Sequence, residues 1–205
     1  MGRRISGRQA FLLVAPFPPL ALFKIWASAG RPGGALLAGS ALMLAYCVFV
    51  IVLARRWDKP TYFDITACAY FSITTVSLLF LPGSAAAFLE RYPVTGIYAS
   101  LFCAAFLPTI LGKPPFIEHY ARKFAPESVW DNPVFRRINR IMAFVWAAMF
   151  GVSTFLSLYP SAITRAYIPL ALILGVGVPF NIRFPDRYLR HLGIPSLAEQ
   201  KKTMR

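Results

Sequence analysis

The stretch Lys113-Pro-Pro-Phe-Ile-Glu-His-Tyr-Ala-Arg-Lys-Phe-Ala125 decides how this chain is organised. It separates two long apolar blocks, and its own residues alternate between an apolar and a polar side at helical spacing. Phe116, Tyr120 and Phe124 share one side, with Ile117 beside them. The polar residues Glu118, Arg122 and Lys123 lie on the other. This pattern predicts an amphipathic helix in the plane of a membrane surface.

A turn and a basic cluster follow this helix. Pro126 ends it, and Trp130 suits the headgroup zone of a bilayer. Asn132 is a candidate N-cap for the next helix, with Pro133 at its first position. We predict two groups of functional side chains. The interfacial anchors are Phe116, Tyr120, Phe124 and Trp130. The contacts to anionic lipid headgroups or a protein partner are Arg122, Lys123, Arg136 and Arg137.

The composition is that of a membrane protein. Of the 205 residues, 57% are hydrophobic and 15% are charged, whereas a soluble domain carries about 25% charged residues. The apolar residues come in blocks close to the roughly 20 residues that a spanning helix needs. We predict an all-α fold: a single polytopic membrane domain over residues 1–182, followed by a basic cytoplasmic tail over 183–205. The predicted spans are 10–27, 34–54, 63–81, 94–111, 138–158 and 163–182.

The first block has two interpretations. Pro16, Pro18 and Pro19 predict a kinked spanning helix, since each proline removes a backbone donor. A basic start, an apolar core and Ala27-Ser-Ala29 also resemble a cleavable signal peptide, whose removal would leave five spans.

Three further features concern the connections and the packing. Residues 82–93 are predicted to form a short loop. Gly96, Ser100 and Ala104 recur every four residues, a small-residue stripe that lets another helix approach closely. Residues 184–191, at the start of the tail, are expected to lie along the membrane.

The net charge of +14 is distributed unevenly between the two sides of the predicted bundle. Eighteen of the 22 lysines and arginines fall in the N-terminal segment, in the connections after the second and fourth spans and in the tail. The positive-inside rule therefore predicts that both termini are cytoplasmic. We read the basic residues as topology signals and as contacts to anionic lipid, and we expect no nucleic-acid partner.

No catalytic or cofactor-binding pattern is present in the sequence. Cys47, Cys68 and Cys103 lie in apolar blocks without metal-site spacing, and the two histidines fall outside the predicted spans. Glu118, His119 and Asp131 are the best catalytic candidates. Adjacent helical residues do not face each other, so a solvated polar surface explains them better. We therefore expect no cofactor, no metal and no enzymatic activity.

Several short motifs resemble the intracellular septation protein A family of bacterial inner-membrane proteins, over about Phe11 to Tyr159. These motifs are Pro19-Leu-Ala-Leu-Phe-Lys-Ile-Trp26, Val94-Thr-Gly-Ile-Tyr98, Lys113-Pro-Pro-Phe-Ile117, Val129-Trp130, Arg137-Ile-Asn139 and Phe144-Val-Trp-Ala-Ala-Met-Phe150. The resemblance implies a non-enzymatic inner-membrane protein that supports cell-envelope integrity and septation. Its implied partners are other inner-membrane proteins of the division or wall-elongation machinery. The alternatives are a small-molecule or lipid transporter and an accessory subunit of a larger membrane complex.

Overall fold

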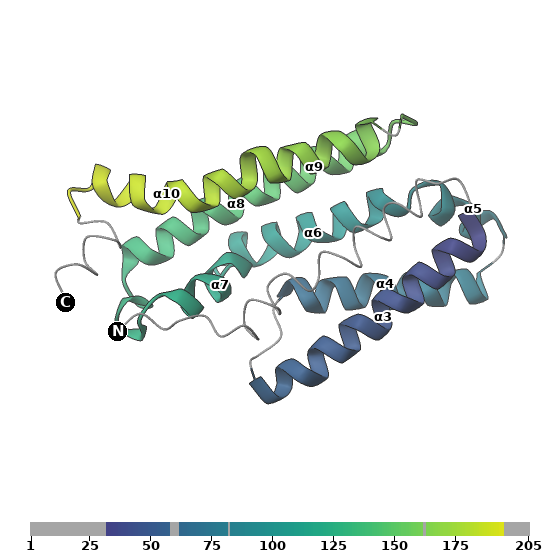
Figure 1. Ribbon diagram of the computed structural model, residues 1–205, viewed down its shortest axis with the longest axis horizontal. Helices are drawn as coiled ribbons and strands as arrows, with labels where there is room; N and C mark the ends of the chain where they lie inside the picture. Colours follow the sequence, from purple (N-terminus) through teal and green to yellow (C-terminus); the bar gives the residue numbers. More distant parts are fainter. Residues whose placement is uncertain (1–31, 58–61, 82, 162, 195–205) are drawn as a thin grey trace.

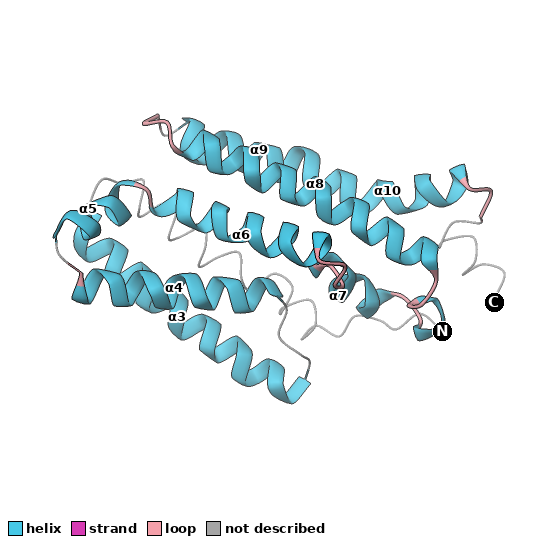
Figure 2. Cartoon of the chain, turned by 180° about the vertical axis from the view of Figure 1, so that it is seen from behind, coloured by secondary structure: helices cyan, strands magenta, loops and turns pink. Residues whose placement is uncertain are grey.

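A computed structural model of the chain describes residues 32–57, 62–81, 83–161 and 163–194, and every regular element in these ranges is helical (Figures 1 and 2). The predicted first span, 10–27, lies outside the described residues, as does the end of the tail. The long helices are α3 (Pro32–Trp57), α4 (Tyr62–Phe80), α6 (Pro93–Ile110) and α8 (Pro133–Ser157). Shorter ones are α5 (Gly83–Arg91), α7 (Phe116–Phe124) and the 3-10 turn η1 (Glu127–Val129).

The last helical stretch runs without a break from Ile163 to His191. It consists of the π-helical turn η2 (Ile163–Tyr167), α9 (Ile168–Leu172), a second π-helical turn η3 (Ile173–Gly177) and α10 (Val178–His191). Each π turn lies a few residues ahead of a proline, Pro169 or Pro179. A π turn has an i→i+5 hydrogen bond and usually occurs as a single turn inside an α-helix. Prolines and π turns are both recognised causes of helix kinks.

Two segments that were predicted to lie outside the spans are helical. Residues 83–91 form α5 rather than a loop, because the run Ser-Ala-Ala-Ala-Phe-Leu favours a helix between the prolines at 82 and 93. Helix α10 continues past residue 182, the predicted end of the sixth span, to His191. Pro185 lies inside α10, and Leu189 on the same segment is buried, with Phe184 and Tyr188 packed against the core. Tertiary packing thus extends the helix beyond the predicted end of the span.

The long helices lie roughly along the long axis of the molecule, and successive ones run in opposite directions (Figure 1). Helix α3 packs on α4, α4 on α6, and α6 on α8, while α9 and α10 follow α8 on its other side. This alternation brings the end of α6, helix α7, the start of α8 and the end of α10 to one end of the bundle. Because this end carries Arg122, Arg136, Arg137, Arg140, Arg183, Arg187 and Arg190, we call it the arginine-rich end.

Three of the described helices are long and apolar enough to cross a membrane: α6, α8 and the stretch Ile163–His191. The described apolar parts of α3 and α4 are shorter, Leu37–Phe49 and Ile65–Phe80. The structure therefore supports a helical membrane protein with three candidate spans. Prediction and structure agree closely for the fourth span, with residues 94–111 predicted and 93–110 observed.

The outward sides of these helices are apolar. Exposed large side chains include Leu42, Phe49, Ile73, Phe80, Leu107, Phe155 and Ile182. Exposed apolar surface of this extent is unusual for a soluble monomer and is expected where lipid covers the protein.

The core forms mainly between α6 and α8. Ile97, Tyr98 and Ala105 of α6 join Ala147 and Phe150 of α8 in one buried cluster. The helices approach closely where a residue lacks a side chain. A Cβ placed on Gly96 would lie 2.7 Å from Cε2 of Tyr70 on α4. Gly96, the first residue of the predicted small-residue stripe, thus leaves room for an aromatic side chain of α4.

The polar groups inside the bundle are mostly hydroxyls that bond to their own helix. Thr74, Ser100 and Thr109 each donate to the carbonyl four residues earlier, at 2.7–2.8 Å. Hydrogen bonds between side chains of different helices are fewer. The hydroxyl oxygens of Ser157 on α8 and Thr95 on α6 lie 2.8 Å apart, and Trp146 donates to Asn181 at 3.4 Å. Apolar packing is thus the main contact between the described helices.

Candidate lipid and partner interface

A sharp turn leads from α6 into the arginine-rich end. Gly112 has φ +68°, the left-handed conformation that glycine adopts without a steric penalty. The amide of Lys113 donates to the carbonyl of Pro108 at 2.9 Å and that of Leu111 to Leu107 at 3.0 Å, a glycine-based C-terminal cap. Pro115 then takes an extended backbone conformation as N-cap of α7. The sequence Gly-Lys-Pro-Pro therefore fixes where α6 ends and α7 starts.

Helix α7 is present where the amphipathic pattern predicts it, but its first turn is buried in the protein. Phe116, Ile117 and Glu118 are 5%, 6% and 3% exposed, and α7 packs against α8. The expectation that Glu118 lies on an exposed polar side is wrong, because this carboxylate lies inside. Of the predicted anchors, Phe116 belongs to the core cluster. Tyr120 and Trp130 are half-buried and keep part of their surface accessible.

Arg122 is held between a carboxylate and an aromatic ring. Its Nη2 and Nε lie 2.5 and 3.1 Å from Oε1 of Glu118, one helical turn earlier. Its guanidinium carbon stands 5.1 Å from the centre of the Trp130 ring, within cation–π range. Trp130 Nε1 donates to the carbonyl of Ala125 at 3.2 Å. Arg122, predicted as a lipid or partner contact, is thus engaged inside the protein, where it joins α7 to the turn before α8.

The start of α8 is organised as the sequence predicts. Asn132 is the N-cap, and its Oδ1 accepts from the amide of Val134 at 2.8 Å, with Pro133 at the first position. Arg136 pairs with the exposed Asp131, Nη2 to Oδ1 2.6 Å. Arg137 is exposed and forms no ion pair with any described residue.

The predicted contact residues therefore divide into two classes. Arg122 and Arg136 are internally paired, whereas Arg137 is available to an external anion. The side chains of Lys123 and Phe124 lie outside the described set. Arg140, predicted only as part of the basic topology signal, is exposed one helical turn after Arg136. Arg183, Arg187 and Arg190, predicted in the same way, follow one another at i, i+4, i+7 spacing on α10.

Two of the three catalytic candidates are paired with arginines. Glu118 is bonded to Arg122 and Asp131 to Arg136, so both carboxylates are occupied by arginines. Over the residues that the structure describes, no group of three or more His, Cys, Asp and Glu side chains has the arrangement of a metal site. The described cysteines are free thiols, with Cys47 buried and Cys103 exposed.

Comparison with family models, with curated proteins and with solved structures gives no match for this chain.

Proposed function

We propose that this protein is a non-enzymatic component of a bacterial inner membrane, with both termini cytoplasmic. In this proposal it supports cell-envelope integrity and septation by binding other membrane proteins. The order of short motifs that resembles the septation family supports this function, and the charge bias among the predicted connections supports the orientation. Its partners are proteins of the division or wall-elongation machinery, together with anionic lipid headgroups.

The observation that carries the proposal is the fixed corner between α7 and α8, residues 116–140. Phe116 and Ile117 anchor α7 in the core, and Arg122 connects Glu118 with Trp130. This corner holds Arg137 and Arg140 exposed at the first turns of α8. A packed corner with accessible arginines suits recognition of an acidic partner segment, because little loop ordering is required on binding.

Two of the motifs that support the resemblance lie at the contact between α6 and α8. Ile97 and Tyr98 of the second motif, and Ala147 and Phe150 of the last, are buried in the cluster between α6 and α8. The motif over 113–117 leads the chain from α6 into the buried first turn of α7. The residues quoted for the resemblance thus include core residues of this fold, and the septation role is tested separately.

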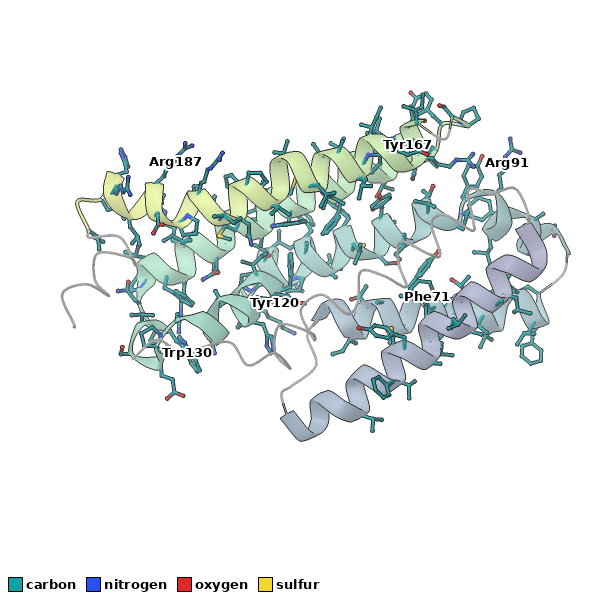
Figure 3. The ribbon with its side chains drawn as sticks, viewed as in Figure 1. Phe71, Arg91, Tyr120, Trp130, Tyr167 and Arg187 are labelled. Atoms are coloured by element: carbon teal, nitrogen blue, oxygen red, sulfur yellow. The ribbon has the colours of Figure 1, made fainter. Side chains whose placement is uncertain are left out.

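The experiment is deletion of the gene in its native bacterium, followed by measurement of cell length and septum spacing. The proposal expects longer cells with fewer septa, rescue by the wild-type gene and loss of rescue by R137Q/R140Q. The control is R91Q, which removes one exposed arginine at the opposite end of the bundle (Figure 3). Normal division in the deletion strain would refute the septation role.

A pull-down of the tagged protein in mild detergent, with mass spectrometry, separates the alternatives. Division or wall-synthesis proteins recovered with wild type and lost with R137Q/R140Q would support the proposal. A single stoichiometric partner of another class would indicate an accessory subunit. A protein without partners that gives substrate-dependent flux in proteoliposomes would indicate a transporter.

A further inference from the structure

The stretch from Ile163 to His191 is longer than the apolar part of a bilayer. At about 1.5 Å per residue its 29 residues extend about 40 Å, compared with a hydrocarbon core of about 30 Å. Its outward side is apolar up to Ile182, with Leu170, Leu174, Val178 and Ile182 all exposed. The next residue is Arg183. The change from apolar to cationic surface therefore falls at the level where a spanning helix leaves the hydrocarbon.

The arginines beyond this point form a single stripe. At about 100° per residue, Arg183, Arg187 and Arg190 fall within about 60° of one another around α10. All three are exposed. Leu189 is buried on another side, and Phe184 and Tyr188 pack against the core. Figure 3 shows the labelled Arg187 directed away from the other helices. The stripe thus faces outward, and at about 100° per residue Ile182 lies about 100° from Arg183 around the same helix.

No described residue forms an ion pair with the arginines of the stripe. The ion pairs recorded for the described residues involve Arg122 and Arg136, and none involves these three arginines. Asp186 is the one acidic residue on this segment. Its Oδ1 is buried and it forms no ion pair with Arg183 or Arg190. Three neighbouring guanidinium groups of like charge therefore have no ion-pair partner among the described residues.

We propose that Arg183, Arg187 and Arg190 form a binding surface for the phosphate groups of anionic phospholipids in the leaflet at the arginine-rich end. Guanidinium groups donate two parallel hydrogen bonds to a phosphate and bind it more specifically than an ammonium group does. Their aliphatic stems lie along the apolar surface while the charged groups reach the headgroups. This contact fixes the depth of α10 in the membrane. It does not depend on the septation role.

The test is the lipid selectivity of the full-length protein reconstituted in phosphatidylcholine vesicles. Electron paramagnetic resonance of spin-labelled phosphatidylglycerol, compared with spin-labelled phosphatidylcholine, measures which lipid the protein retains at its surface. We expect a preference for phosphatidylglycerol in the wild type, reduced at least tenfold in R183Q/R187Q/R190Q. Each basic residue near a charged surface contributes about fivefold to such a preference. The preference should also fall as salt rises.

The matched control is K201Q/K202Q/R205Q, which removes the same charge from the end of the chain. A loss confined to the arginine stripe supports the proposal. Equal losses in both variants would show general electrostatic attraction. No loss in either variant would show that the stripe contacts a protein or water instead. Either result would overturn the proposed lipid site. R183K/R187K/R190K keeps the charge and should lose less than the glutamine variant. If the glutamine variant does not fold, the wild-type selectivity and its salt dependence still decide, since a wild type without preference refutes the site.

Discussion

The ring of Tyr70 on α4 covers Gly96 on α6 so closely that no Cβ fits between them. An added Cβ would lie 2.7 Å from Cε2 and 2.8 Å from the hydroxyl oxygen, which itself donates to the carbonyl of Pro93 at 2.6 Å. The contact and this hydrogen bond join α4 to the first turn of α6. An alanine at position 96 would therefore require the Tyr70 ring to move.

We expect Gly96→Ala to lower the free energy of unfolding in detergent by about 1–3 kcal/mol, because the Tyr70 ring must move or the helices must separate. Thermal unfolding followed by circular dichroism measures the change. Gly175→Ala is the matched control, since nothing lies within 4 Å of a Cβ there and alanine favours a helix. The double variant Tyr70→Ala/Gly96→Ala should lose less unfolding free energy than the sum of the losses of the two single variants. Equal stability of the two glycine variants would contradict the close contact.

A second prediction compares how much stability is lost when either member of the Glu118–Arg122 ion pair of α7 is replaced. Arg122→Gln leaves the buried Glu118 without its guanidinium partner, whereas Glu118→Gln leaves an arginine that is 35% exposed and still stacked on Trp130. Leaving a buried charge unpaired costs several kcal/mol, whereas a partly exposed charge is solvated by water. Arg122→Gln should therefore destabilise more than Glu118→Gln. Proteolysis of the connection between α6 and α8 reports the loosening, and the reverse order would refute the assignment.

The cap of α8 gives a third prediction. Asn132→Ala removes the acceptor for the Val134 amide and should cost about 1 kcal/mol. Asn132→Asp keeps an acceptor at the same position and should retain the stability. Chemical unfolding of the two variants side by side provides the measurement, and an alanine variant as stable as the aspartate variant would argue against the cap.

The proposed orientation gives a fourth prediction. In a background with all three cysteines replaced by alanine, Ser84→Cys and Ser161→Cys should react with a membrane-impermeant maleimide in intact cells. Ser128→Cys, at the arginine-rich end, should react only after permeabilisation. All three serines are exposed, so each new thiol is accessible to the reagent from its own side. Labelling of Ser128→Cys in intact cells would reverse the proposed topology.

The sequence predicted helix type and helix centres well, because a long apolar block has few alternatives to a buried helix. It also predicted the start of α8, since Asn132 and Pro133 act locally. The sequence predicted less well the burial and the secondary structure of residues for which tertiary contacts determine both. Glu118 carries the signature of a solvated residue and becomes buried because Arg122 lies within reach on the next turn. Residues 184–191 contain a proline and many charges, yet packing of Leu189 and its neighbours keeps them helical.

The π turn η3 precedes α10 and sets the direction in which the arginine stripe points. A π turn closes its hydrogen bond over one residue more than an α turn does, so every side chain after Gly177 is rotated by about 100° relative to an uninterrupted α-helix. Loss of one residue from Ile173–Gly177 would therefore turn Arg183, Arg187 and Arg190 together around the helix without changing any of them. Deletion of a single codon in the apolar half of this helix would thus change the direction of three surface side chains at once.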